Sequence, residues 1–226
     1  MILGIDEAGR GPVLGPMVVA GVVLRPPRAG ALTRRGVSDS KDFGAGDEAR
    51  KKRAELASHI RRLAEDVHVE VFDPRTVDDF ASQGLLNELE RRGARAIIAG
   101  APPVRRIVAD GQRLFGTLTV EYPHLEARDF GETVHVAVAA ASIIAKDLRD
   151  RLFEEIAVRY RDEFGEVRGG GYVNAATADF LRRYHDRYGQ LPPETRRSWG
   201  WTLLNELDPP PLPLFDPPSG VHVGKN

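Results

Sequence analysis

The sequence has no cysteine and no long uncharged apolar run among its 226 residues. Without cysteine, the chain cannot form disulfides, thiolate zinc sites or a cysteine nucleophile, and it suits a reducing compartment. A membrane-spanning helix needs roughly 20 predominantly apolar residues in succession, so no segment is predicted to cross a membrane. The chain enters an apolar run at Ile2 without a basic leader or a cleavage site. This start predicts a cytoplasmic protein without a secretory signal.

Several common catalytic motifs are also missing. The chain has no P-loop of the G-x-x-x-x-G-K-[ST] type, no G-x-S-x-G nucleophile elbow and no H-E-x-x-H metal helix. Its 6 histidines are scattered without the spacing of zinc ligands. These absences argue against P-loop nucleotide hydrolases, α/β-hydrolases and zinc proteases of the H-E-x-x-H type.

A strong excess of positive charge is lacking too, since the formal net charge is −1. This balance argues weakly against a nucleic-acid-binding domain, because such domains are often basic. A local basic groove can nevertheless hold a phosphate backbone whatever the net charge is. Arginine greatly outnumbers lysine, which suits bidentate phosphate contacts, although genome composition or heat adaptation produces the same bias.

Apolar strands mixed with amphipathic helices predict one α/β domain. A turn rich in glycine and proline, residues 9–16, separates the first two strands. The small-residue run Ala137–Ala141 would let a long helix pack closely on the sheet. We predict a catalytic domain with C-terminal helices over residues 1–207 and a proline-rich, poorly ordered tail over 208–226. The predicted strands are 2–5, 17–24, 67–72, 106–109 and 118–122, and the predicted helices are 47–66, 77–93, 134–164, 175–188 and 194–207.

Four acidic residues stand at the ends of predicted elements. Asp6 and Glu7 end the first strand, Asp110 ends a later strand, and Asp129 precedes the long helix. Each alone also fits a solvated strand end, a turn residue, or an acid that is favourable near a helix N-terminus. Successive strand residues point to opposite faces, so we expect the backbone to turn at Ala8-Gly9 if Asp6 and Glu7 share a site. Together the four carboxylates predict an oxygen-ligand site for Mg²⁺ or Mn²⁺.

The run from Ile5 to Val18, IDEAGRGPVLGPMV, closely resembles the opening signature of the ribonuclease HII family. Further segments agree with the family in order and approximate spacing, and the resemblance covers residues 1–207. These segments are Asp39-Ser40-Lys41, Asp110-Gly111, the AAASIIAK run at 139–146, Gly171-Tyr172 and Arg197-Ser198-Trp199.

The resemblance implies a ribonuclease H-like fold, with a mixed central sheet flanked by helices and a C-terminal helical part. It also implies a divalent-metal site, for Mg²⁺ or Mn²⁺, built from four acidic residues. These map to Asp6, Glu7, Asp110 and Asp129. The stretch between Asp129 and the AAAS run is longer than in the family pattern, so Glu126 and Glu132 are alternatives for the fourth position.

The implied activity is hydrolysis of the RNA strand of RNA–DNA hybrids and incision 5′ of single ribonucleotides in duplex DNA. Such incision leaves 3′-hydroxyl and 5′-phosphate ends and serves ribonucleotide excision repair and DNA replication. Gly9-Arg10-Gly11 resembles the element that reads the ribose 2′-hydroxyl, and Tyr172 resembles a tyrosine that stacks at the RNA–DNA junction. The residues similar to phosphate contacts are Lys41, Ser142, Lys146 and Arg197.

The chain departs from the family pattern at Asp147, where an apolar residue is expected, and around the tyrosine, at Gly169–Gly171 and Val173. These departures concern junction recognition more than the acidic set. The tail shows no glutamine-led hydrophobic-aromatic motif for a sliding clamp, and we expect a monomer.

Three alternatives remain open. The sister type 3 ribonuclease H carries an extra N-terminal substrate-binding domain, for which we expect no room before Asp6. Another nuclease or strand transferase on the same fold is the second, because fold does not fix function. The third is a non-catalytic duplex-binding module, which predicts that metal changes neither activity nor substrate integrity.

Overall fold

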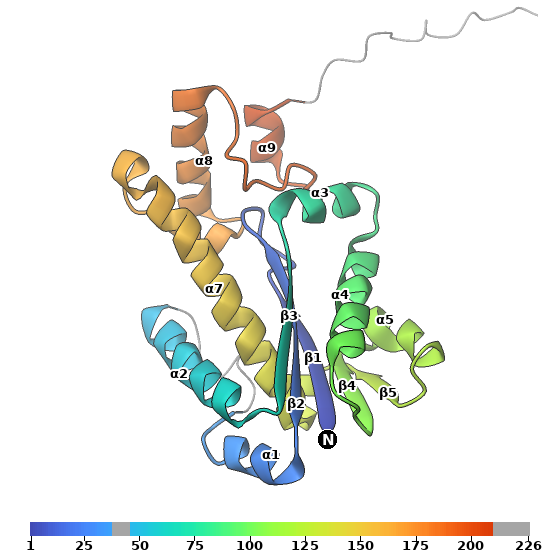
Figure 1. The fold of residues 1–226 in the computed structure, drawn as a ribbon. Coiled ribbons are helices and arrows are strands. Elements are labelled where there is room, and N and C mark those ends of the chain that lie inside the picture. The colour runs from blue at the N-terminus through green and yellow to red at the C-terminus, as the bar shows by residue number, and fades with distance from the viewer. Residues whose placement is uncertain (38–45, 210–226) are drawn as a thin grey trace, which may run out of the picture.

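The computed structural model describes residues 1–37 and 46–209, and its strands form one mixed sheet (Figure 1). Strand order in this five-stranded sheet is β3-β2-β1-β4-β5. Antiparallel pairs join β1 to β2 and β2 to β3, whereas β4 runs parallel to both β1 and β5. The predicted α/β class and mixed central sheet are therefore confirmed. The strands are β1 (Ile2–Ala8), β2 (Met17–Leu24), β3 (Asp66–Phe72), β4 (Arg106–Asp110) and β5 (Leu125–Arg128).

One face of the sheet is covered by α7 (Val136–Phe164), with α2 (Asp47–Leu63) packed against α7 (Figure 1). The run Ala137–Ala141 is fully buried there, as its small side chains predict. The helix lies so close to β1 that a Cβ on Gly4 would stand 2.1 Å from the backbone carbon of Ala137. This close packing fixes the height of α7 over the sheet.

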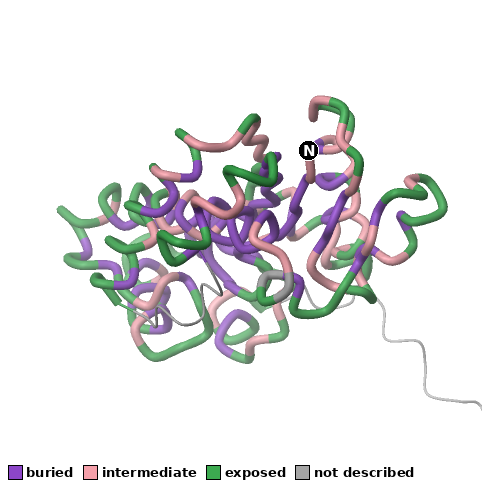
Figure 2. Tube along the Cα trace, turned by 90° about the horizontal axis from the view of Figure 1, so that it is seen from below, coloured by how far each residue is buried: buried purple, intermediate pink, exposed green. Residues whose placement is uncertain are grey.

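The opposite face is covered by α4 (Leu86–Gly100). Its Ala94 and Ile97 pack against Leu3 and Ile5 of β1 in a second buried cluster. Figure 2 shows the buried residues running through the strands and the inner sides of the helices, with exposed residues outside them. The shorter helices are α1 (Pro26–Thr33), α3 (Pro74–Ser82), α5 (Gln112–Phe115), η2 (Gly116–Val120), α6 (Gly131–Val134) and η3 (Gly169–Gly171).

The C-terminal part is helical, as predicted, and holds α8 (Ala175–Tyr188) and α9 (Thr202–Leu207). An aromatic cluster fills it, in which the Tyr160 ring centroid lies 5.3 Å from that of Phe180. Val13 and Leu14, from the turn between β1 and β2, are buried in the same cluster. The C-terminal helices therefore anchor the β1–β2 turn (residues 9–16).

Three sequence predictions of local structure were wrong. Residues 118–122 are not a strand, because Gly116–Val120 forms a 3₁₀ helix and the last strand is Leu125–Arg128. The predicted helix 77–93 is two helices, separated where Gly84 adopts a positive φ of 72°. Of the predicted helix 194–207 only Thr202–Leu207 is helical, since Thr195 forms a bridge with Leu14.

Lys41 and its Asp39-Ser40-Lys41 motif lie outside the described residues, as does the tail from residue 210. The domain boundaries stay a prediction. None of the helices in the described ranges is long and apolar enough to span a bilayer.

Candidate active site

Asp6 and Asp110 end two neighbouring parallel strands. Ile5 of β1 pairs with Ala109 of β4, so the next residue on each strand is an aspartate. Asp6 is 5% exposed and hydrogen bonds with the Ser142 side chain of α7. The Asp110 carboxylate accepts a hydrogen bond of 2.7 Å from the amide of Gly131. The carboxyl ends of β1 and β4 thus place two carboxylates side by side.

Glu7 lies beside them although the strand stays regular between Asp6 and Glu7. β1 stays regular through Ala8, which pairs with Val18 of β2. The backbone leaves the strand at Ala8-Gly9, where Gly9 has a φ of 85°, and so turns after the two acids and not between them. Asp6 and Glu7 still interact because they are adjacent at the strand end, and the Glu7 amide donates a 2.8 Å hydrogen bond to Asp6 Oδ1.

Electrostatic repulsion marks this acidic cluster, defined as Asp6, Glu7 and Asp110. Burial raises the pKa of Asp6 well above its usual range, and the charges of Glu7 and Asp110 add to the effect. Burial also raises the pKa of Glu7 to about 7, with further repulsion from Glu90 of α4 and from Asp110. A bound cation would offset this repulsion, since an opposite charge favours the ionised carboxylates.

The fourth acidic position is less well defined. Asp129 is exposed, and its carboxylate accepts a 2.8 Å hydrogen bond from the backbone N–H of Gln112. Glu126 forms ion pairs with Arg106 and Arg128 on β4 and β5. Glu132 follows Gly131, whose amide reaches Asp110, but its own side chain lies outside the described part of the structure.

No three acidic or histidine side chains within the described ranges already converge as ligands of a single ion. A metal site here therefore needs a side-chain rotation in the acidic cluster, or a ligand from the segment that follows β5. The donor set itself suits a hard cation, because Asp6, Glu7 and Asp110 offer only carboxylate oxygens.

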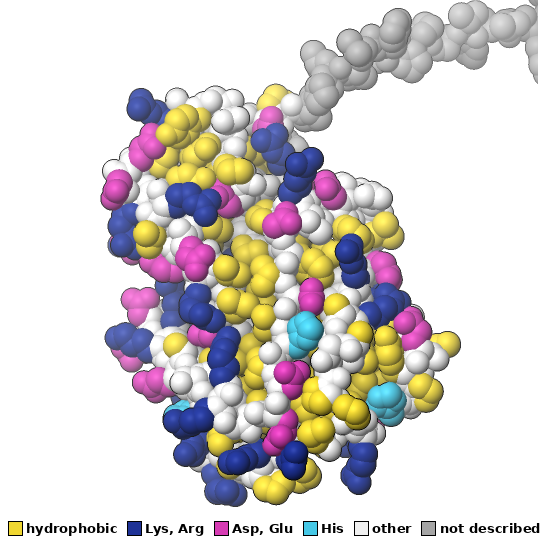
Figure 3. Space-filling view, viewed as in Figure 1, with side chains coloured by type: hydrophobic (Ala, Val, Ile, Leu, Met, Phe, Trp, Pro, Cys, Tyr) yellow, Lys and Arg dark blue, Asp and Glu magenta, His cyan; other side chains and the backbone are white. Residues whose placement is uncertain are grey.

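A cavity of about 600 Å³ adjoins the acidic cluster at Glu7. It brings together several residues predicted from the sequence, namely Glu7, Gly9, Arg10, Gly11, Lys146 and Tyr172. Three more arginines line it, Arg50 and Arg53 of α2 and Arg149 of α7. Elsewhere, the face seen in Figure 3 carries charges of both signs interspersed. The cavity thus has the local basic character that the net charge of the chain conceals.

Two predicted phosphate contacts lie elsewhere. Ser142 is fully buried and hydrogen bonds with Asp6. Arg197 is exposed and pairs with Asp208. Their contact with phosphate stays a prediction, and the observed role of Ser142 is to hold Asp6.

Tyr172 faces the cavity beside the β1–β2 turn. Its side chain is 49% exposed, and its ring lies 5.2 Å from the Arg149 guanidinium carbon. A Cβ on Gly11 would stand 3.8 Å from the edge of the ring. The preceding Gly171 carbonyl accepts a 2.8 Å hydrogen bond from Val13. The departure at Gly169–Gly171 has a physical cause, since all three adopt positive φ angles that glycine tolerates.

Two buried arginines at the turn were not predicted. Arg149 is 3% exposed and donates to the Gly170 carbonyl, whereas Arg196 is fully buried and donates to the Gly15 carbonyl at 2.9 Å. Burial lowers the pKa of both guanidinium groups, that of Arg196 to about 9. Spacing could have indicated Arg149, because it follows Lys146 by three residues on α7 and shares its face.

Comparison with known proteins agrees with this geometry. The ribonuclease HII family model matches residues 3–202. A ribonuclease HII from Methanothermobacter thermautotrophicus is 37% identical over 205 residues, which cover 88% of this chain and 95% of that protein.

Solved structures of the same class share the fold. Ribonuclease H2 from Pyrococcus horikoshii OT3 has a TM-score of 0.76 at 28% identity and covers 91% of this chain and 96% of its own. The PCNA:RNase HII complex from Archaeoglobus fulgidus gives 0.73 at 31% identity, with 90% and 96% covered. Bst-RNase HIII in complex with Mn²⁺ gives 0.64 at 26% identity, with 83% and 62% covered.

The predicted ribonuclease H-like fold is thereby confirmed. The family match spans most of the chain, and the relative that is 37% identical is named a ribonuclease HII, which favours this family over the alternatives. The chain belongs to the ribonuclease HII family and is a ribonuclease H, an endonuclease that hydrolyses phosphodiester bonds.

Proposed function

We propose that the enzyme, besides hydrolysing the RNA strand of RNA–DNA hybrids, cuts duplex DNA immediately 5′ of a single embedded ribonucleotide. The products would carry 3′-hydroxyl and 5′-phosphate ends. One observation carries the proposal: the acidic cluster opens at Glu7 onto the cavity that Gly9-Arg10-Gly11 and Tyr172 line. Candidate chemistry and candidate ribose recognition therefore adjoin each other.

Divalent cations, Mg²⁺ or Mn²⁺, fit the acidic cluster. Burial raises the pKa values of Asp6 and Glu7 most, and repulsion between the ionised carboxylates raises them further. Asp6, Glu7 and Asp110 would hold the metal, with a fourth ligand from Asp129 or Glu132. When bound, one or two such ions supply an activated water and stabilise the departing 3′-oxygen. The Mn²⁺ complex of the RNase HIII neighbour supports this assignment.

The remaining residues bind and orient the substrate. Backbone groups of Gly9-Arg10-Gly11 would hydrogen bond the 2′-hydroxyl, which distinguishes RNA from DNA. The half-exposed Tyr172 ring would pack on the sugar that follows the ribonucleotide. Lys146 and the newly found Arg50 would contact phosphates from the cavity wall, and Lys41, Ser142 and Arg197 remain candidates from the sequence.

The expected setting is ribonucleotide excision repair and DNA replication in the cytoplasm, with the enzyme as a monomer. The Archaeoglobus fulgidus neighbour was solved as a PCNA complex. The tail of this chain lacks a glutamine-led clamp motif, so we propose that its activity does not depend on a clamp contact through the tail.

The test uses a duplex with one ribonucleotide, a continuous RNA–DNA hybrid and a matched all-DNA duplex, each with Mg²⁺, with Mn²⁺ or with chelator. The proposal expects one metal-dependent cut at the 5′ side of the ribonucleotide, with the end chemistry given above, and no cut in all-DNA. Cleavage of the hybrid alone would refute the single-ribonucleotide activity. Cleavage that persists in chelator would refute the metal site.

A further inference from the structure

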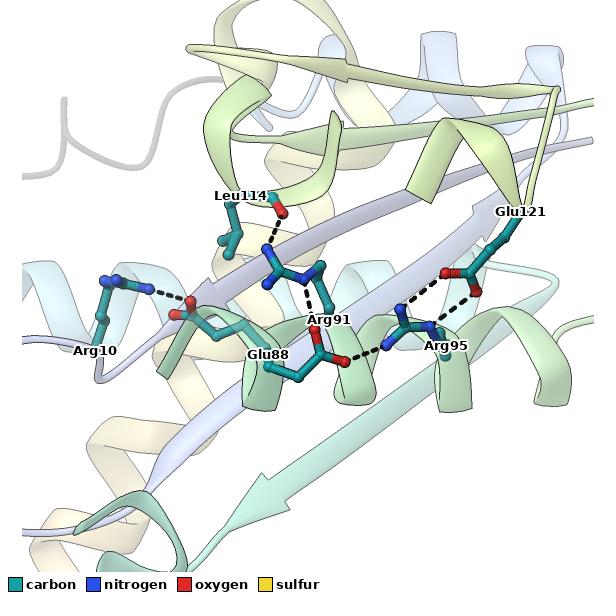
Figure 4. Close-up of polar contacts among 7 residues, drawn as sticks. Arg10, Glu88, Arg91, Arg95, Leu114 and Glu121 are labelled. Carbon is teal, nitrogen blue, oxygen red and sulfur yellow. Dashed lines mark hydrogen bonds and ion pairs between the residues drawn. The ribbon is translucent and has the colours of Figure 1, made fainter. Parts of the chain in front are cut away.

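Arg10 is the charged residue of the Gly9-Arg10-Gly11 element, and its side chain is already bound to the protein. Its guanidinium forms an ion pair with Glu90 and donates a 2.7 Å hydrogen bond to Asn87 Oδ1. Both partners come from α4, three residues apart and thus on one face of the helix. Figure 4 shows the Arg10 side chain reaching toward α4. An arginine held in this way is not free to follow a phosphate.

Glu90 is an unusual partner because its side chain is fully buried. Within the described residues its Oε1 has no hydrogen-bond partner, so Arg10 provides the main compensation for its charge. A buried carboxylate is costly unless it is paired, which indicates that this position serves a purpose beyond packing. The other acids drawn on α4 and nearby, Glu88 and Glu121, pair with Arg91 and Arg95 on the more exposed side (Figure 4).

The backbone of the same turn is also held by residues of the C-terminal part. Arg196 donates to the Arg10 carbonyl at 3.3 Å, and the Trp199 indole donates to the Gly11 carbonyl at 3.0 Å. Every described peptide bond is trans, so the Gly11 N–H points away from the carbonyl that Arg196 binds. In the described part of the chain, the Arg10 and Gly11 amides have no hydrogen-bond partner, while both residues line the cavity. The carbonyls are therefore fixed and the amides are left for a ligand.

We propose that Glu90 is a positioning residue for ribose recognition. Through Arg10 it fixes the amides of the β1–β2 turn at the cavity, and the Arg10 side chain is a tether to α4, not a phosphate ligand. This inference rests on the proposed function, since the ligand of those amides is the ribose of the embedded ribonucleotide.

The first experiment compares Glu90→Gln with the matched control Glu88→Gln, the same substitution two residues earlier on α4. Steady-state kinetics use the one-ribonucleotide duplex. Glu90→Gln should lower kcat/KM by about tenfold or more, mainly through kcat, because a displaced turn misplaces the substrate without removing a phosphate contact. Glu88→Gln should match wild type. Equal values for both variants and wild type would overturn the proposal.

The second experiment measures duplex binding against salt concentration without divalent metal. A phosphate ligand lowers the slope of log K against log[salt] by about one unit when it is removed. Arg10→Gln should leave the slope at the wild-type value, and the double variant Arg10→Gln/Glu90→Gln should be no less active than the worse single variant. A slope reduced by one unit, or independent losses that multiply, would show that Arg10 binds phosphate itself.

Asn87→Ala guards against misfolding of the Glu90 variant, because Asn87 is exposed and its removal leaves no buried charge. It should lower kcat in the same direction with an unchanged melting temperature, and an unchanged kcat would count against the tether. Wild type is measured alongside throughout. If wild type does not cut at the ribonucleotide, the proposed function fails. If wild type cuts there and the Glu90 and Asn87 variants cut with the same kcat/KM, only the positioning role is refuted.

Discussion

The acidic cluster and the β1–β2 turn both contain buried ionisable groups, but these groups differ in the partners that the fold gives them. In the acidic cluster, burial and mutual repulsion raise the pKa values of Asp6 and Glu7. At the turn, burial lowers the pKa values of Arg149 and Arg196, yet their guanidinium groups donate to backbone carbonyls of the turn and of η3. The fold thus satisfies the cations only in part, since Arg149 Nε and Arg196 Nη2 have no hydrogen-bond partner in the described part of the chain. The acidic cluster instead keeps a repulsion that a bound cation would offset. The buried arginines therefore support the structure of the turn, whereas the acidic cluster is suited to bind a ligand.

Removal of one carboxylate tests the anionic side most strongly. Asp110→Asn keeps the side-chain shape but loses charge at the strand end, so we expect cleavage to fall by about a thousandfold or more. Duplex binding should largely survive, since the cavity arginines are untouched. Single-turnover rates and a binding isotherm measure both quantities. Near-normal turnover would remove Asp110 from the site, and a melting curve checks that the strand end still folds.

The fourth acidic position gives a second large effect. The sequence placed Asp129 first, but the structure shows its carboxylate exposed and bonded to the Gln112 amide, while Gly131 contacts Asp110. We therefore expect Glu132→Gln to lower the rate by about a hundredfold and Asp129→Asn to lower it less. Glu126→Gln serves as the control, because Glu126 is paired with Arg106. The reverse order would restore the assignment made from the sequence.

Stability without metal should reveal the strain in the acidic cluster. The pKa of Glu7 rises from 4.5 to about 7 on folding, so the folded protein keeps a proton that the unfolded chain releases. The metal-free protein should therefore lose up to about 3 kcal/mol of stability as the pH rises from roughly 4.5 to 7.

Glu7→Gln should melt above wild type at pH 8 in chelator and close to it at pH 4.5. Saturating Mg²⁺ should reduce the difference in melting temperature between the two proteins at pH 8, because bound metal stabilises wild type more. The same difference in melting temperature at both pH values would mean that Glu7 acts on stability through packing alone.

The smallest expected effect lies at the turn. Tyr172→Ala removes a ring that rests on Arg149, and loss of one stacking contact costs about 1–3 kcal/mol in single-stranded systems. The loss in kcat/KM should be about tenfold on the one-ribonucleotide duplex and less on a continuous hybrid, which lacks a unique junction. Equal losses on both substrates would show that Tyr172 supports general binding.

The acidic residues of the candidate site were easier to predict from the sequence than the residues that hold the β1–β2 turn. Asp6, Glu7 and Asp110 could be found because each ends an apolar strand, and strand pairing then places them together. Glu90 could not be found, since it follows Arg10 by 80 residues and its burial depends on how α4 crosses the sheet. The local sequence pattern predicts where strands end, whereas the contacts that hold a turn depend on tertiary packing.

Two of the wrong elements have different causes. Leu118 and Tyr122 alternate like a strand, but local hydrogen bonds such as Tyr122 N–H to the Leu118 carbonyl, at 2.8 Å, stabilise a helical turn instead. In the segment predicted as helix 194–207, the Arg196 amide bonds with the Val13 carbonyl at 2.8 Å. That contact with the β1–β2 turn outweighs helix propensity, which is a weak preference.

The acidic cluster at the strand ends is proposed to hold the catalytic cation. Crystals grown with Mn²⁺ and examined by anomalous scattering would locate that cation. We expect an anomalous peak bonded to carboxylate oxygens of Asp6, Glu7 or Asp110, and we expect this peak to be lost in Asp110→Asn crystals. A well-occupied Mn²⁺ elsewhere, with the acidic cluster free of metal in the wild-type protein, would contradict it.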